Sequence, residues 1–112
     1  MKYYTIQNDK IIELSKANLN EIKRGMTGHE ALDFAKKNHL RLPFIFEVVK
    51  DIETNKNLKQ ILTDGWIWTG EQYNGCLSGL SLNRNLYLYS YWHGLADSFS
   101  AGRVVFVKGE SK

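Results

Sequence analysis

The chain of 112 residues divides near Asp64 into a charged first part and an almost uncharged, aromatic second part. Residues 1–60 hold eleven basic and eight acidic side chains, whereas residues 61–112 hold four of each. Between Gln72 and Ala96 the only formal charge is Arg84. Nine of the fourteen aromatic residues, including all three tryptophans, follow Asp64. Because aromatic residues favour strands, we expect an α+β fold in which a helical part packs on an aromatic sheet.

Length and composition exclude several classes of protein. A chain of 112 residues is the size of one domain, so we expect a single domain over residues 1–112. The lone Cys76 excludes an intrachain disulfide framework and a cysteine-rich zinc site. Residues 1–9 lack the apolar stretch of a signal peptide, and no apolar run approaches the roughly 18 residues of a membrane span. We therefore expect a cytoplasmic or virion-associated protein without a membrane partner.

Residues 1–25 are expected to form a hairpin followed by a polar connection. Tyr3–Gln7 and Lys10–Leu14 are rich in strand formers, and the Asn-Asp pair between them favours a turn. A helix over Ile11–Ile22 is the alternative, because apolar residues there recur roughly on one face.

Residues 26–60 are expected to form the two-helix part. Thr27 and Glu30 have the spacing of a capping box, which predicts a helix over Thr27–Asn38. The outer face of that helix carries lysines near its C-terminus, where positive charge is favourable.

A second, largely buried helix is expected over Phe44–Ile52. Pro43 precedes it and is suited to the first helical position. The β-branched residues in this segment leave a strand as the alternative. The polar segment Glu53–Lys59 is expected to be a loop or a frayed turn.

Residues 61–112 are expected to form the aromatic-rich β part. Three segments have the composition of strands: Trp66–Thr69, Leu86–Tyr91 and Arg103–Val107. Two glycine-containing segments between them are expected to be loops or turns: Gly70–Gly79 and Gly94–Gly102. Strict alternation in the second strand places three tyrosines on one face.

The order of these motifs resembles the bacterial C-type-lectin-like domains of unknown function. The matching stretches are Arg41-Leu-Pro with Glu47, Trp68-Thr-Gly-Glu, the aromatic strand and a terminal Arg103-Val-Val, within Gly28–Lys108. Formylglycine-generating enzymes and the variable proteins of diversity-generating retroelements are more distantly similar. The resemblance implies two helices packed on a small, twisted, mostly antiparallel sheet with long loops. It also implies a structural role for six residues: Arg41, Pro43, Glu47, Trp66, Trp68 and Arg103.

The chain departs from the catalytic and calcium-binding members of that fold. It has neither the Glu-Pro-Asn or Gln-Pro-Asp motif nor the Trp-Asn-Asp motif of calcium-dependent lectins. It also lacks the cysteine pairs of formylglycine-generating enzymes. His29, His39 and His93 do not have metal-ligand spacing, and no spacing supports a Cys76–His93 nucleophile. We therefore expect a protein that is not an enzyme, with no catalytic residue, metal or cofactor.

The expected binding surface is the late aromatic strand and the loops beside it. Its candidate residues are Tyr87, Tyr89, Tyr91, Trp92, Arg84 and His93. These rings either cover a half-buried sheet or form a binding face, since tyrosine is enriched in binding hot spots. In the related fold this region often displays the binding surface. We expect noncatalytic recognition of a protein or glycan by a monomer or homodimer, in a phage, viral or mobile-element accessory protein.

A helix-turn-helix regulator is the alternative function. The two expected helices and the turn His39–Leu42 fit that motif, and Lys36, Lys37 and Arg41 would contact phosphates. However, the second helix is apolar and acidic where contacts to DNA need polar and basic groups. Nucleic acid is therefore not the expected partner.

Overall fold

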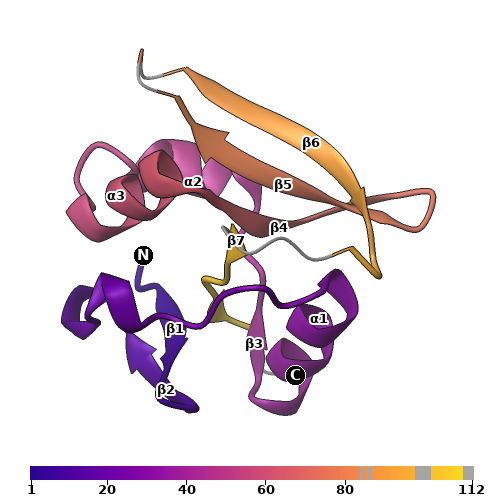
Figure 1. Cartoon of the computed structure of the whole chain (residues 1–112), viewed down its shortest axis with the longest axis horizontal. Coiled ribbons are helices and arrows are strands. Elements are labelled where there is room, and N and C mark those ends of the chain that lie inside the picture. The colour runs from indigo at the N-terminus through magenta and orange to yellow at the C-terminus, as the bar shows by residue number, and fades with distance from the viewer. Residues whose placement is uncertain (84, 86, 98–101, 110–112) are drawn as a thin grey trace.

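In the computed structural model, which describes residues 1–83, 85, 87–97 and 102–109, three α-helices pack on a curled four-stranded sheet (Figure 1). Its strands are β4 (Trp66–Tyr73), β5 (Cys76–Leu82), β6 (Leu88–Gly94) and β7 (Gly102–Arg103). They lie in the order β6-β5-β4-β7, antiparallel except for the β4–β7 pair. The expected α+β class is confirmed, but the described residues form one helix more than the two expected.

The N-terminal hairpin is confirmed. Strands β1 (Tyr4–Gln7) and β2 (Lys10–Glu13) pair antiparallel. Asn8 and Asp9 connect them with φ of 52° and 61°, the left-handed backbone that a two-residue hairpin turn requires. Two 3-10 turns follow, η1 (Leu14–Lys16) and η2 (Leu19–Glu21), so the alternative of a continuous helix is wrong.

Helix α1 (Gly28–Lys37) begins as its capping box predicts. The Glu30 amide donates to Thr27 Oγ1 at 3.1 Å, and the Thr27 amide donates to Glu30 Oε1 at 2.9 Å. Ala31 and Ala35 lie on the buried face, where their small side chains let the helix approach the sheet closely.

Helix α2 (Ile45–Asp51) is shorter and more exposed than expected. Phe44 is its N-cap, so Pro43 precedes the cap and does not occupy the first helical position. Phe46 is 70% exposed, and only Glu47 and Val48 are buried within the helix. The expectation of a largely buried helix is wrong, because the helix lies at the surface.

Helix α3 (Lys56–Asp64) replaces the loop expected over Glu53–Lys59. The Asn55 side chain accepts a hydrogen bond from the Leu58 amide at 3.0 Å, which caps the helix. Leu58, Ile61 and Leu62 are fully buried at the spacing of one helix face. Of the segment expected to be a loop, Asn55 is therefore the cap of this helix and Lys56–Lys59 its first turn.

A β-hairpin replaces the loop expected over Gly70–Gly79. Strand β4 continues through an irregularity between Trp68 and Gln72, and β5 returns beside it. Asn74 and Gly75 connect them with φ of 49° and 74°. An Asn-Gly pair is a strong hairpin signal, so glycine here marks a tight turn and not an open loop.

The last strands differ in position from those expected. Strand β6 begins at Leu88, and Leu86 lies outside the described residues. The strand expected over Arg103–Val107 is divided into β7 and β8 (Val107–Lys108). Between them Phe106 exchanges two hydrogen bonds with Tyr4, at 2.7 and 2.8 Å. Of the turn expected over Gly94–Gly102, residues 98–101 lie outside the described residues.

The sheet separates two apolar clusters. On one face Ile67, Leu80 and Leu82 pack with residues of α2 and α3. On the other face Trp68 and Leu77 pack with Ala31 and Ala35 of α1. Figure 1 shows α2 and α3 at one end of the sheet and α1 at the other. No helix in the described part of the chain is long and apolar enough to cross a membrane.

Candidate functional site

Four aromatic rings gather on one face of the sheet, beside the buried Trp68. We call this set the aromatic face: Trp66, Tyr89, Tyr91 and His93. Strand pairing places the residues of the aromatic face on the same side of the sheet, because Ser81 of β5 lies opposite both Trp66 of β4 and Tyr89 of β6. Side chains at paired positions share a face of the sheet, and so do alternate residues along a strand.

The rings of the aromatic face form a continuous row. Trp66 and His93 stack with centroids 5.1 Å apart and planes 21° apart. Tyr91 lies 6.2 Å from His93, and Tyr89 stacks on Tyr91 at 6.3 Å. Gly79 lies beneath this row, where a Cβ atom would be 3.0 Å from His93 Cδ2 and 3.1 Å from Trp66 Cε3. The missing side chain at Gly79 therefore makes room for the two rings.

A shallow pocket of about 250 Å³ opens on the aromatic face. Trp66, Ser81, Tyr91 and His93 line it. The rings supply flat apolar surfaces, and the serine and tyrosine hydroxyls both donate and accept hydrogen bonds. These lining residues include no Asp, Glu, Lys or Arg, so the pocket suits a ligand that carries flat apolar surface and hydroxyl groups.

The structure does not bring together all the residues that were expected to form one binding surface. Tyr89, Tyr91 and His93 lie on the aromatic face, whereas Trp92 lies on the opposite face, 5.9 Å from the ring of Tyr73. Tyr87 precedes β6 and is exposed. Arg84 lies outside the described residues.

The sequence predicted a structural role for Trp66 and did not single out Ser81 or Gly79. Trp68 is 1% exposed and its indole donates to the Met26 carbonyl at 2.9 Å, whereas Trp66 is only partly buried and lines the pocket. The missed signal was the Asn-Gly turn, because a hairpin there pairs β5 with β4.

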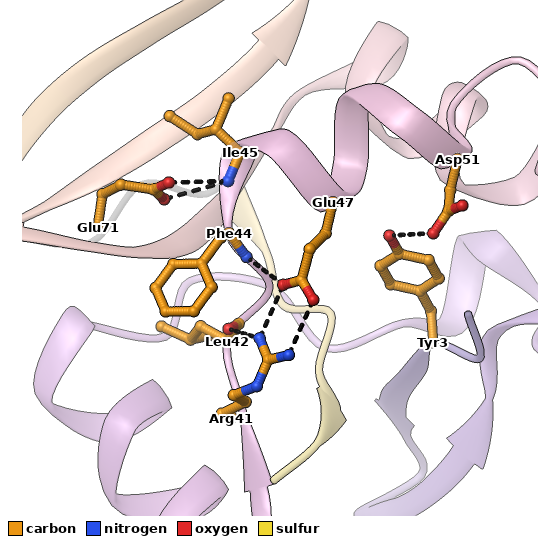
Figure 2. A network of polar contacts seen from close by, with 8 residues as sticks. All are labelled: Tyr3, Arg41, Leu42, Phe44, Ile45, Glu47, Asp51 and Glu71. Carbon is orange, nitrogen blue, oxygen red and sulfur yellow. Dashed lines mark hydrogen bonds and ion pairs between the residues drawn. The ribbon is translucent and has the colours of Figure 1, made fainter. Parts of the chain in front are cut away.

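The Arg-Leu-Pro motif forms a polar network at the start of α2 (Figure 2). Arg41 donates from both terminal nitrogens to Glu47, at 2.7 and 2.8 Å. Glu47 also accepts from the Phe44 amide at 2.8 Å, which satisfies one of the unpaired amides at the helix start. Arg41 further lies 5.1 Å from the centre of the Phe44 ring.

Residues at the irregularity in β4 connect the sheet to the start of α2 by hydrogen bonds. The Glu71 carboxylate accepts from the Ile45 amide at 2.9 and 3.2 Å (Figure 2). The Gly70 amide donates to the Pro43 carbonyl at 2.9 Å, and a Cβ at Gly70 would lie 3.0 Å from the Phe44 ring. Both carboxylates, Glu47 and Glu71, therefore hold backbone in place and leave no pair poised for acid–base chemistry.

Glu47 gives this network a pH dependence. Hydrogen bonds from Arg41 hold the pKa of Glu47 below its ordinary value of 4.5, against the opposing effect of burial. Because the folded pKa is lowered, the contribution to stability is present above 4.5 and is lost as the pH falls through the folded pKa. We expect Glu47→Gln to reduce the free energy of unfolding near neutral pH by about 1.5–3 kcal/mol, the range for hydrogen bonds to charged groups.

Urea unfolding at a series of pH values checks this expectation. The loss caused by Glu47→Gln should shrink as the medium becomes acidic, because the wild-type carboxylate is then protonated too. The matched control is Asp33→Asn, at an exposed carboxylate of α1. An equal loss at every pH would show that the side chain contributes packing and not charge.

Arg103 is buried in β7, 2% exposed. Among the described residues its Nε and Nη1 atoms have no hydrogen-bond partner. Burial lowers its pKa, nearby Arg24 lowers it further, and Asp64 opposes both effects. Its position beside Ile67 of β4 is inside the fold, away from the aromatic face.

The described part of the chain contains neither a metal-binding cluster nor a cysteine placed beside a histidine base. No group of three or more His, Cys, Asp or Glu residues there is arranged to hold a metal ion. Cys76 pairs with Gly94, and His93 pairs with Leu77, so Cys76 and His93 point to opposite faces of the sheet. They cannot act as a nucleophile and its base.

The segment between α1 and α2 is not the turn of a helix-turn-helix. There β3 (Leu40–Arg41) pairs antiparallel with β8. Helix α2 has seven residues and exposes Phe46 and Val49. This apolar surface is unlike the polar face that a recognition helix presents to base edges.

No protein-family model, no curated protein and no solved structure gives a significant match to this chain. The resemblance to C-type-lectin-like domains therefore stays a prediction that rests on the order of its motifs.

Proposed function

We propose that the protein is a noncatalytic recognition module whose aromatic face binds a neutral glycan. The observation that carries the proposal is the pocket of about 250 Å³ between Trp66, Ser81, Tyr91 and His93, whose lining includes no Asp, Glu, Lys or Arg. A sugar ring has C–H bonds with partial positive charge on its flat sides, and these are attracted to the negative face of an aromatic ring. Its hydroxyl groups match the hydroxyls of the pocket.

The size of the pocket sets how much of a glycan it can hold. It is smaller than the roughly 300–1,000 Å³ of pockets that enclose drug-sized ligands. It therefore suits one ring of a longer chain, with the neighbouring units lying along Tyr91 and Tyr89. The rings are held by strand pairing in a rigid sheet, so little conformational freedom is lost on binding.

The scaffold we propose is C-type-lectin-like, supported by the order Arg41-Leu-Pro, Glu47, Trp68-Thr and Arg103-Val-Val. The mode of binding is not that of calcium-dependent lectins, whose proline-containing motifs the chain lacks. Stacking and hydroxyl hydrogen bonds carry the recognition in its place.

Binding of the labelled protein to immobilised oligosaccharides tests the proposal. We expect binding to neutral chains of glucose, galactose or mannose units, unchanged by EDTA, with shifts of the His93 imidazole signals on titration. Sulfated and sialylated chains are the comparison set. Binding restricted to charged chains, loss of binding with EDTA, or no binding to any neutral chain would each contradict the proposal.

A further inference from the structure

Among the described residues, strand β6 is a long unpaired edge of the sheet. It terminates the order β6-β5-β4-β7 and has seven residues (Figure 1). The opposite edge, β7, has only two residues, and Arg103 within it also bridges to Arg24. An unpaired edge presents backbone amides and carbonyls to any strand that approaches it.

The pairing of β6 with β5 identifies the groups that face outward. The Asn83 amide donates to the Tyr87 carbonyl at 2.9 Å, and the register continues without a bulge from there to Gly94. Bonded and non-bonded pairs alternate along an antiparallel ladder. The backbone groups of Leu88, Ser90 and Trp92 therefore point away from β5, and no hydrogen bond within the described residues satisfies them.

The edge has a defined end, and β6 itself carries none of the residues that usually protect an edge strand. The Gly94 amide is already bonded to Asp97 Oδ2 at 2.9 Å, so the open part runs from Leu88 to Trp92. Natural edge strands are commonly protected by lysine, proline, a bulge or an inward-pointing charge. Strand β6, Leu-Tyr-Ser-Tyr-Trp-His-Gly, has no lysine, proline or carboxylate, and its pairing has no bulge.

We propose that two copies of this chain pair through β6, antiparallel, with the twofold axis at Ser90. Ser90 then lies opposite Ser90 of the second copy, and Leu88 lies opposite Trp92. Each of these pairs exchanges both of its backbone hydrogen bonds, so every outward group from Leu88 to Trp92 is satisfied. The two four-stranded sheets become one continuous sheet.

A second copy fits this edge because the edge is complementary to itself. A twofold axis brings one copy of β6 against another of the same charge, so charged side chains on β6 would repel, and β6 has no carboxylate, lysine or arginine. Tyr89 lies opposite Tyr91 of the second copy, a cross-strand aromatic pair of the kind that stabilises sheets. The aromatic faces stay open and lie side by side.

The oligomeric state of the full chain in the absence of any glycan tests this proposal independently of the proposed function. Light scattering after size exclusion should give twice the chain mass of 12.9 kDa. Ser90→Lys should give a monomer, because it places two positive charges together at the axis. Gln72→Lys, an exposed position on β4, adds the same charge away from the edge and should stay dimeric.

Hydrogen exchange resolved to single amides distinguishes this dimer from any other. In the wild type the amides of Leu88, Ser90 and Trp92 should exchange slowly, and in Ser90→Lys they should exchange fast. The Tyr89 and Tyr91 amides, which face β5, should stay protected in both, which shows that the variant is folded. A wild-type monomer at every concentration, a dimeric Ser90→Lys, or a dimer with fast exchange at Ser90 would overturn the proposal.

Discussion

Replacing Trp68 with alanine is expected to leave the protein largely unfolded at room temperature. Trp68 is 1% exposed and packs in the cluster between the sheet and α1. Truncating a buried tryptophan to alanine costs about 3–5 kcal/mol, and the orphaned Met26 carbonyl adds about 1–3 kcal/mol. The total is comparable with the roughly 5–15 kcal/mol that stabilises a typical domain.

Thermal and urea unfolding measure this effect, with Trp68→Phe as the matched control. Phenylalanine keeps most of the buried ring but loses the indole donor, so we expect a smaller loss and a folded protein. If Trp68→Ala unfolds at nearly the wild-type urea concentration, the ring is not a principal part of the core.

The double variant Tyr89→Ala/Tyr91→Ala is expected to stay folded and to lose glycan binding. The two side chains are 43% and 54% exposed, so their truncation removes little buried surface. Their rings extend the row that begins at Trp66 and His93, and Tyr91 lines the pocket. We expect binding to fall by about a thousandfold, since two aromatic hot-spot residues at about 2 kcal/mol each cost about 4 kcal/mol together.

Tyr73→Ala is the matched control for this prediction. Tyr73 is 63% exposed and its ring contacts Trp92 on the opposite face of the sheet, so its loss should leave binding unchanged. Circular dichroism and urea unfolding establish whether each variant is folded. If the double variant unfolds, Tyr89 and Tyr91 belong to the core; if it binds normally, the site lies elsewhere.

Local signals in the sequence predicted the elements that depend on a few neighbouring residues. The Asn-Asp turn gave the first hairpin, and the Thr27–Glu30 box gave the start of α1. Both signals act over two to four residues, so they are independent of what packs against them. The predicted resemblance also drew attention to Arg41 and Glu47, which the structure places in contact.

Two further local signals were present but were outweighed by composition. Asn55 with Leu58 and Ile61 has the cap and the spacing of α3, yet polar neighbours favoured a loop. The Asn-Gly pair at 74–75 marks a hairpin, yet three glycines between 70 and 79 favoured a long loop. The β4–β5 hairpin, which builds the pocket, was therefore missed.

The sequence by itself determined that Trp66 and Trp68 share a face, and that Tyr89 and Tyr91 do, because side chains alternate along a strand. Only the tertiary structure decided which of these rings is core. Helix α1 packs over the Trp68 end of that face, while β6 at the sheet edge leaves its tyrosines exposed. Alternation is a property of each strand alone, but burial depends on which distant segment covers it.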